Sequence, residues 1–598
     1  YFFVYGLELI PANMIEKVEV VRGGGSALYG SNAIAGTINI LLKDPIKNSY
    51  EIGFNYSAVG VGIEQDKLSA DYSLNFNTSI VSADLKTGLT VYGFTRDRGI
   101  FDANADGFSE ISPMSNLTLG SRFFHRFGYR NKLSVDYFAI KEERAGGNKY
   151  DLPLHRRDVA EAVDHNLQTV SMAYEQFFRD YDLFTIFGAG QFLNRDSYYG
   201  ANQSLSDYGN SVDRTYNIGA QYKANFSYAS LIAGLEHTGS YLTDKKLGYP
   251  DYENAVIENN TIVEVPQIGN TLVSDQALLT SGAFAQYDLQ LDKLKIAVGG
   301  RFDHYQVIDN AKPDAEAKTG NVFSPRLSLM YSIHSQLQAR VSYSQGYRAP
   351  QIFDEDLHIE TSGSRQVINV NAPDLKQETS HSTMLSLDYN GLIGPVFTGL
   401  LVEGFYTRLS NPFVNEIGTP DENGTVLYTR VNAEDGATVS GVNIELKLKP
   451  SRKLSFNSGF TIQKSIYDQA QEFDEKRFFR TPDNYGFFAV DWELSKKFKL
   501  SATGNYTGTM LVPYFGPNTN PDFGELRTSD EFFDLGLKFR YNIKLNGATM
   551  QWYGGVKNLF NAYQNDFDLG IDRDPAYMYG PVAPRTLYIG VKIGNLVN

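Results

Sequence analysis

The 598-residue sequence contains no cysteine, and it has only 8 histidines and 2 tryptophans. Without cysteine there is no disulfide, no thiolate metal site and no cysteine nucleophile. No stretch reaches the roughly 18 consecutive apolar residues of a membrane-spanning helix, and mean hydropathy is −0.31. The patterns G-x-S-x-G and H-E-x-x-H are also absent. Nothing in the sequence therefore predicts an enzyme.

Positive charge is in deficit, with 54 Lys and Arg against 69 Asp and Glu and a net charge of −15. Binding to nucleic acid needs basic patches, so a nucleic-acid partner is not expected. The abundant residues are 39 Tyr, 39 Phe and 54 Gly. Aromatic and glycine enrichment without cysteine is typical of a β-rich protein that assembles outside the cytoplasm without disulfides.

Three consecutive glycines (23–25) lie between two β-branched runs and raise the question of a phosphate-binding loop. A P-loop needs Lys directly after its last glycine, but no lysine follows Gly30 until Lys43. A dinucleotide fingerprint needs a glycine three places after Gly25, and that position is Leu28. Both nucleotide hypotheses fail, and the glycines are expected to serve backbone geometry instead.

Beyond Asp44 apolar and polar residues alternate, as in "KLSADYSLNF" and "YEIGFNYSAV", which predicts half-buried strands of about ten residues. Connections alternate as well: a tight turn such as "RDYD" after a strand at 166–178 is followed by a strand at 183–196 and a long loop. The link from His304 to about Asn321 is another that we expect to be long. Counting to the C-terminus gives roughly 22 strands.

This pattern predicts an all-β protein, a 22-stranded up-and-down antiparallel transmembrane barrel whose closure removes its edges. Short turns are expected at the periplasmic rim and long loops at the extracellular rim. A barrel of this size needs a plug in its lumen, and the segment before the first strand has the mixed character of a small α/β element. A chain of β-sandwiches or a propeller would show interdomain linkers or blade repeats, which we do not find.

The opening segment resembles the C-terminal part of the plug domain of TonB-dependent outer-membrane receptors. The resemblance rests on a strand ending in Arg-Gly (Ile15–Gly23), a Ser-Ala-Leu-Tyr-Gly turn (Ser26–Gly30) and a closing strand (Gly36–Ile40). Four further segments fit the barrel of the same family: "GGRFDHY", "FSPRLSLMYS", "SYSQGYRAP" and "GGVKNLFNAY". The family implies a partial plug at 1–46 and a barrel at 47–598, with most of the plug and the TonB-contacting segment expected before Tyr1.

The resemblance also implies contacts between plug and barrel. Glu19 and Arg22 are expected to face charges on the barrel wall, and the backbone is expected to pack closely at Gly23, Gly24 and Gly25. Partners implied by the family are the TonB–ExbB–ExbD complex, a small metal-chelate ligand, outer-membrane lipid and, in some members, a surface lipoprotein. The location implied is the outer membrane of a Gram-negative bacterium.

One long loop is the expected substrate contact, because loops on a rigid scaffold commonly carry binding residues. Its "YRAP" and "NAPDL" segments resemble the paired boxes of haem and cobalamin receptors, with a histidine between them that could ligate haem iron. The residues predicted to contact substrate are Tyr347, Arg348, His358, Asn371 and Asp374.

A second loop, "DANADG", has the spacing of the first half of a calcium loop. Asp102, Asn104, Asp106 and Glu110 are the candidate Ca²⁺ ligands, although the twelfth position, where a bidentate Glu is expected, is proline. The alternative is an ordinary Asx-turn loop. No other cofactor is required.

These observations predict a TonB-energised receptor that imports a scarce, bulky nutrient. Cobalamin is the first expectation because the loop is most similar to cobalamin receptors and a negative net charge slows the approach of anionic chelates. Haem and ferric siderophores are the alternatives. A passive pore is the alternative of another class, and the plug-like segment argues against it.

Overall fold

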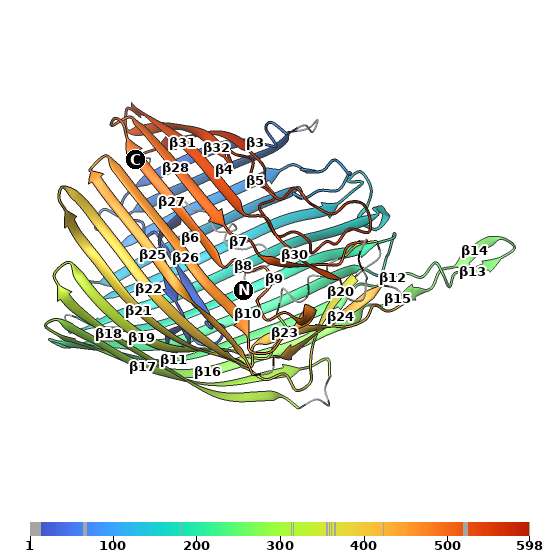
Figure 1. Cartoon of the computed structure of the whole chain (residues 1–598), viewed down its shortest axis with the longest axis horizontal. Helices are drawn as coiled ribbons and strands as arrows, with labels where there is room; N and C mark the ends of the chain where they lie inside the picture. Colours follow the sequence, from blue (N-terminus) through green and yellow to red (C-terminus); the bar gives the residue numbers. More distant parts are fainter. Residues whose placement is uncertain are drawn as a thin grey trace.

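The computed structural model describes residues 14–63, 68–179, 181–312, 314, 316–353, 357, 359, 361–363, 366–422, 424–433, 435–517, 519 and 524–596. A closed antiparallel barrel of 22 strands dominates the structure, so the predicted fold class is confirmed. Each strand pairs with its neighbours in sequence, and β3 closes the wall by pairing with β33 (Figure 1).

The barrel strands occur in chain order and have the following bounds: β3 (Ser49–Val59), β4 (Ser69–Val81), β5 (Thr87–Arg98), β6 (Met114–Gly128), β7 (Asn131–Gly147), β8 (Val159–Phe178), β9 (Asp182–Ala201), β10 (Tyr208–Asn225), β11 (Ala229–Lys246), β16 (Thr271–Leu291), β17 (Leu294–Asp309), β18 (Lys318–His334), β19 (Leu337–Arg348), β21 (Glu378–Ile393), β22 (Val396–Ser410), β25 (Ala437–Ser451), β26 (Leu454–Tyr467), β27 (Asn484–Glu493), β28 (Phe498–Thr507), β31 (Phe532–Leu545), β32 (Ala548–Lys557) and β33 (Thr586–Gly594).

Alternation along each strand separates two faces of the wall. On β3, Tyr50, Ile52, Phe54 and Tyr56 are exposed on the outside of the barrel, where a closed barrel presents its apolar side to lipid. The residues between them point to the other face and are more polar. The two-residue period seen in the sequence therefore reports lipid-facing positions. Among the described residues, no helix is long and apolar enough to cross a bilayer.

The connections differ in length at the two rims. Links such as 292–293 and 335–336 are tight turns at one rim, and long loops gather at the other (Figure 1, right). One expected long loop is shorter than predicted, because β17 continues to Asp309 and β18 begins at Lys318. The longer strands are stabilised by one buried cluster, which contains Tyr305, Val307 and Val322.

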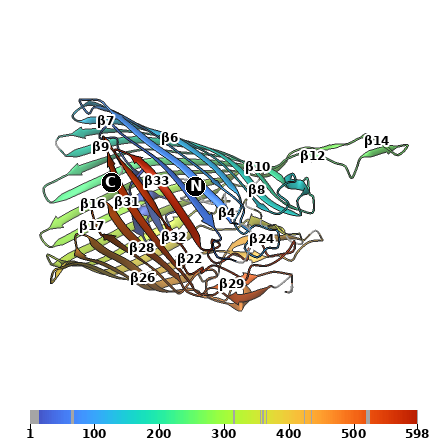
Figure 2. The same ribbon diagram turned by 90° about the horizontal axis from the view of Figure 1, so that it is seen from above.

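The long loops carry small elements of their own: η3 (Leu154–Arg156), β12 (Tyr249–Pro250), β13 (Val256–Glu258), β14 (Thr261–Glu264), β15 (Gln267–Ile268), β20 (Gln366–Asn371), β23 (Phe413–Ile417), β24 (Thr425–Asn432), η5 (Glu472–Asp474), β29 (Leu511–Tyr514) and β30 (Glu525–Thr528). Three of them form one sheet in the order β20-β24-β23. The β13–β14 hairpin projects well beyond the other loops (Figures 1 and 2).

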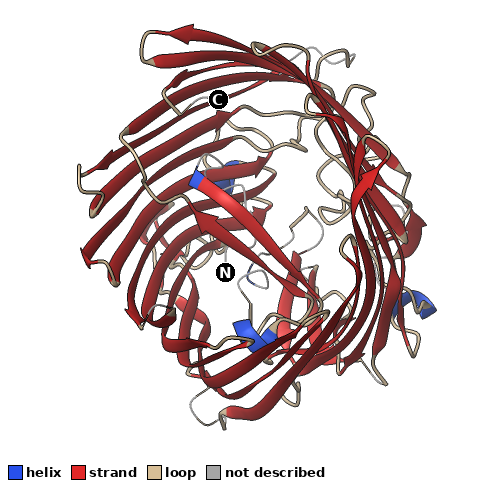
Figure 3. Ribbon diagram, turned by 90° about the vertical axis from the view of Figure 1, so that its left-hand side faces the viewer, coloured by secondary structure: helices blue, strands red, loops and turns tan. Residues whose placement is uncertain are grey.

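The segment before the barrel folds as a hairpin of β1 (Ile15–Arg22) and β2 (Gly36–Leu42) with the short helix α1 (Ser26–Tyr29) at its tip. Figure 3, viewed from the short-turn rim, shows this hairpin inside the ring of barrel strands. The hairpin ends at Leu42 and the barrel begins at Ser49. The domain boundary at residue 46 stays a prediction.

Candidate functional site

The first contact between the hairpin and the wall is an ion cluster at the end of β1. Arg22 donates from Nη1 to Glu403 Oε1 at 3.1 Å and from Nη2 to Glu445 Oε1. Glu403 lies on β22 and Glu445 on the neighbouring β25, and Asn443 Nδ2 also donates to Glu403 at 3.1 Å. A guanidinium suits this position because its fork of N–H groups reaches two carboxylates at once.

The three glycines follow Arg22 and bring the hairpin backbone against the wall. A β-carbon on Gly24 would lie 2.7 Å from the backbone of Gln345 and Gly346 on β19, so no larger residue fits there. Gly23 has φ +72° and faces Ser382 and Met384 on β21. Gly25, in contrast, faces side chains within the hairpin itself.

The tip of the hairpin is hydrogen-bonded to β19 and β21. The Ser26 hydroxyl accepts from the Tyr347 backbone N–H at 3.1 Å, and the Asn32 N–H donates to the Tyr347 carbonyl at 2.9 Å. Ser380 Oγ donates to the Ile34 carbonyl at 2.7 Å. Tyr347, predicted as a substrate residue, is fully buried in this contact.

Below the tip lies a buried network of charges on β11 and β17. Arg301 donates to Glu236 and to Asp303, each at 2.6 Å, and the Tyr347 hydroxyl donates to Asp303 at 2.9 Å. The Arg301 and Asp303 side chains are 2% and 1% exposed. A β-carbon on Gly30 would lie 3.0 Å from Arg301 Nη2, so the hairpin covers the guanidinium.

Glu19 does not make the wall contact predicted for it. Its carboxylate accepts from Lys17 at 2.6 Å and from Asn39 at 3.3 Å, and both partners belong to the hairpin. The reason is register: Glu19 lies directly opposite Asn39 across the β1–β2 pair. Of the two charged residues predicted to contact the wall, only Arg22, at the end of the strand, reaches β22 and β25.

A cavity of about 720 Å³ lies between the hairpin and the wall formed by β21, β22, β25, β26 and β27. Its lining includes Arg22, Gly23, Glu378, Asn443 and Glu445, together with Arg348 at the loop end of β19. This volume is within the range of sites that hold small ligands.

Two arginines and two aromatic rings form the loop-side part of this region, which we call the arginine roof (Arg348, Phe353, Phe413 and Arg430). The guanidinium of Arg348 lies 3.5 Å from the centre of the Phe353 ring, and that of Arg430 lies 5.2 Å from the same ring. Both also lie about 6 Å from the Phe413 ring. At these distances the cations are attracted to the faces of the rings.

Of the other predicted loop residues, Asn371 adjoins the roof, Asp374 is not part of it, and His358 is not described. Asn371 ends β20, where it pairs in register with Arg430 of β24. Asp374 is exposed in the turn that follows. His358 lies outside the described residues, so its predicted role is untested.

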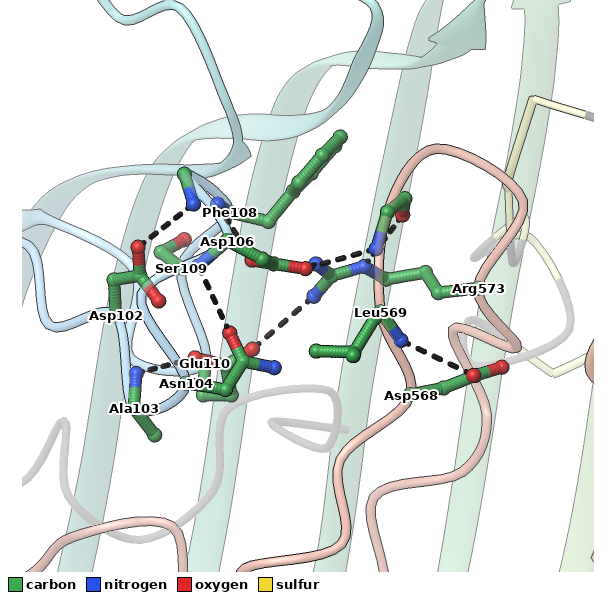
Figure 4. A network of polar contacts seen from close by, with 12 residues as sticks. Asp102, Ala103, Asn104, Asp106, Phe108, Ser109, Glu110, Asp568, Leu569 and Arg573 are labelled. Carbon is green, nitrogen blue, oxygen red and sulfur yellow. Dashed lines mark hydrogen bonds and ion pairs between the residues drawn. The ribbon is translucent and has the colours of Figure 1, made fainter.

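Two of the four predicted calcium ligands, Asp106 and Glu110, contact an arginine from a distant loop (Figure 4). Asp106 accepts from the Arg573 guanidinium and from the Gly570 N–H at 2.8 Å, and Glu110 accepts from Arg573 Nη1 at 3.1 Å. Arg573 also lies 4.3 Å from the Phe108 ring centre. A cationic group thus already sits between two of the four predicted ligands.

The remaining oxygens of that loop make local turns. Asp102 accepts from the Gly107 N–H at 2.8 Å and Asn104 from the Asp106 N–H at 3.2 Å. In the parts of the chain that the structure describes, no group of three or more acidic or histidine side chains is arranged to hold a metal ion. Ca²⁺ binding stays a prediction, and this geometry favours the Asx-turn alternative.

Glu110 gives this contact a pH dependence. Burial raises the pKa of its carboxyl above the ordinary 4.5, against the lowering effects of the Ala103 N–H and Arg573. The contribution of Glu110 to the free energy of unfolding is therefore complete below pH 4.5, and it is lost as pH rises through the raised pKa. We expect amide protection in loop 99–113, corrected for intrinsic exchange, to fall across that range. Glu110→Gln should flatten the profile, and the opposite slope in the wild type would refute the assignment.

Several residues of the site escaped prediction because their partners are remote in sequence. Glu403 and Glu445 lie more than 380 residues after Arg22, and Arg573 lies 463 residues after Glu110. The alternation along a strand predicts that such a residue faces the lumen, but it does not predict which residue it contacts. The sequence signal that could have identified these residues is a charge at an inward-facing position of a strand, as at Glu403.

Comparison with known proteins identifies the family. The family model "TonB dependent receptor-like, beta-barrel" matches residues 148–559, which is more than half of the chain, and the model "TonB-dependent Receptor Plug Domain" matches residues 2–37. The plug match, like the hairpin in the lumen, distinguishes the chain from an open pore.

Individual relatives agree with the family models. The chain is 24% identical to the iron-regulated outer membrane virulence protein of Vibrio cholerae, over 95% of this chain and 79% of that protein. It is 23% identical to the vitamin B12 transporter of Vibrio vulnificus, over 60% of this chain and 52% of that protein. These relatives carry the names of a membrane virulence protein and a transporter, not of enzymes.

A solved structure shows the same fold. The ferric enterobactin receptor of Pseudomonas aeruginosa superposes with a TM-score of 0.72 and 17% identity, over 98% of this chain and 86% of that one. The closed barrel with its lipid-facing apolar side and the outer-membrane relatives place the protein in the Gram-negative outer membrane. The chain belongs to the family of TonB-dependent outer-membrane receptors.

Proposed function

We propose that this receptor takes up a small anionic ferric chelate of the siderophore class. The observation that carries the proposal is the arginine roof, where two guanidinium groups lie near Phe353 and Phe413 and Arg348 lines the lumen cavity. Guanidinium groups beside aromatic rings suit oxygen-rich anions, because they combine positive charge with N–H donors.

In this proposal the charges next to the ligand determine binding more than the net charge of the whole protein does. The net charge of −15 slows the approach of an anion from a distance. At physiological salt, however, exposed charges more than about 8 Å away are largely screened. The charges of the cavity itself, Arg22 and Arg348 together with Glu378 and Glu445, then decide which ligand is retained. The iron-regulated relative covers most of this chain, which supports iron as the cargo.

Cobalamin, our first expectation from the sequence, is the second candidate. It is supported by the relative named as a vitamin B12 transporter, which matches a smaller share of this chain than the iron-regulated relative does. Haem stays an untested alternative, because its predicted axial ligand His358 lies outside the described residues.

Transport would be coupled to the TonB–ExbB–ExbD complex, as the family implies. The Arg22 cluster and the hydrogen bonds of Tyr347 and Ser380 to the hairpin tip hold the hairpin against the wall until force is applied. In this proposal the ligand binds on the loop side of the hairpin, where the cavity is bounded by Arg348.

Titration of the purified full-length receptor with ferric enterobactin, ferrioxamine, cyanocobalamin and haem tests the proposal. We expect a ferric chelate to bind, and Arg348→Ala and Arg430→Ala each to weaken its binding roughly 10- to 100-fold. This estimate follows because hydrogen bonds to charged groups contribute about 1.5–3 kcal/mol. Calorimetry or quenching of intrinsic fluorescence measures the affinity.

Arg452→Ala is the matched control, because Arg452 is exposed in a short turn at the opposite rim and should leave binding unchanged. Tight binding of cyanocobalamin alone would instead favour the second candidate. Binding of a ferric chelate that ignores both roof substitutions would remove the observation on which the proposal rests.

A further inference from the structure

A long hairpin of the loop between β11 and β16, residues 247–270, stands away from the barrel, and we call it the arm. At its base Leu247 donates its N–H to the Tyr208 carbonyl at 2.8 Å, and β12 pairs with β15. Farther out β13 pairs with β14 around Asn259 and Asn260, whose φ values of 50° and 62° suit a tight hairpin turn.

The outer part of the arm is held together only by its own bonds in the described structure. Its hydrogen bonds run from the Asp251 N–H to the Pro266 carbonyl at 2.8 Å, from Asn254 to Asp251, and between β13 and β14. Figures 1 and 2, at right angles to each other, both show β13 and β14 projecting clear of the barrel. An isolated two-stranded hairpin is marginally stable in water.

The arm carries apolar residues that no part of the barrel covers. Ile257 and Ile262 are directly opposite each other across the pair and are 64% and 57% exposed. Tyr252 and Val263 are 61% and 54% exposed. The Ile257–Ile262 pair is an exposed apolar surface at the end of a projecting hairpin, where another protein can reach it. It lies outside the membrane, so lipid does not account for it.

Charge on the arm has one sign. Residues 247–270 contain Asp251, Glu253, Glu258 and Glu264, and they contain no lysine or arginine. Exposed strand edges are ordinarily protected against pairing by charged side chains, lysine above all. The charges beside β13 and β14 are all negative, so a strand that pairs with either edge must be one whose own charge is not negative.

We infer that the arm is a docking site for a basic extracellular protein, which adds an extended segment to an open edge of β13 or β14. Main-chain hydrogen bonds would continue the sheet, apolar side chains would cover Ile257 and Ile262, and Lys or Arg would face Glu258 and Glu264. A second copy of this chain is disfavoured as the occupant, because two acidic arms repel each other.

Two synthetic peptides test this inference on the purified full-length receptor. One has alternating lysine and valine over eight residues, and the other has glutamate in place of lysine. We expect the basic peptide to bind, to slow hydrogen exchange at residues 256–264, and to lose at least about tenfold in affinity between low and high salt. The acidic peptide should not bind.

Variants separate the two parts of the surface. Ile257→Ser with Ile262→Ser should weaken the basic peptide at least about tenfold, and Glu258→Lys with Glu264→Lys should reverse the preference to the acidic peptide. Leu427→Ser is the control, since Leu427 is exposed on another loop strand and should change nothing. The arm variants should keep their affinity for the ferric chelate, because the arm is remote from the cavity.

Three results would overturn the inference. Equal binding of both peptides would mean non-specific apolar contact, and binding of neither would mean that the edge is closed. A concentration-dependent dimer that Ile257→Ser abolishes would identify a second copy as the occupant instead. Each result concerns the arm alone, so it leaves the proposed uptake of a ferric chelate intact.

Discussion

Replacing Arg301 with methionine is expected to lower the free energy of unfolding by about 3–5 kcal/mol, the usual loss when one partner of a buried ion cluster is removed. Arg301 and Asp303 are almost completely buried, so the substitution leaves Asp303 and Glu236 facing each other without a cation. The loss should be large because neither carboxylate has an alternative cation of this geometry in the network.

Denaturant unfolding of the purified protein in detergent, followed by intrinsic fluorescence, measures this loss. The triple variant Arg301→Met, Asp303→Asn, Glu236→Gln should recover much of it, since it removes the unpaired charges together with the arginine. A loss below about 1 kcal/mol in the single variant, or no recovery in the triple, would show that the network does not stabilise the fold as argued.

Gly24→Val is expected to detach the hairpin from the wall at a cost of about 3 kcal/mol or more, the upper part of the range for overpacking. A β-carbon at this position would lie 2.7 Å from the backbone of Gln345 and Gly346, and backbone cannot rotate away as a side chain can. The φ angle of Gly24 is ordinary, so the effect is one of space and not of conformation.

Hydrogen exchange resolves this effect by segment. Amides of β1 and β2 should exchange faster in Gly24→Val, whereas those of the barrel strands should keep their rates. Gly404→Val is the matched control, because a β-carbon there meets nothing within 4 Å. Unchanged protection of β1 and β2 in Gly24→Val would contradict the close packing that we describe.

The barrel was predictable because its signal is local. Alternation over ten residues reports one strand, and the alternation of turn and loop lengths reports the pairing of neighbours, so no long-range information is needed. Where strands run on beyond the expected ends, as at Asp309 and Lys318, the cause is a tertiary cluster around Tyr305 and Val307 that no local pattern contains.

The site was predictable only in part. The motif around Arg22 pointed to a wall contact, but the same reasoning placed Glu19 on the wall, and only the register of β1 with β2 shows that Asn39 faces it. The "DANADG" spacing predicts an oxygen-rich turn that the structure contains, yet Arg573 comes from the last long loop and could not be foreseen. The partner of a charge depends on which strands adjoin in space.

The pairing of β3 with β33, which closes the barrel, constrains the order in which the barrel folds. It pairs residues 51–59 with residues 586–594, and beside it Tyr50 and Asn595, 545 positions apart, are hydrogen-bonded. Contacts so distant in sequence form late, because the entropy of closing the intervening chain must be offset first. Synthesis must therefore be nearly complete before the wall can close. A chain that stopped before Thr586 would expose two strand edges, and each unpaired backbone group in lipid costs several kcal/mol. Insertion into the membrane is thus coupled to the last nine residues of the wall.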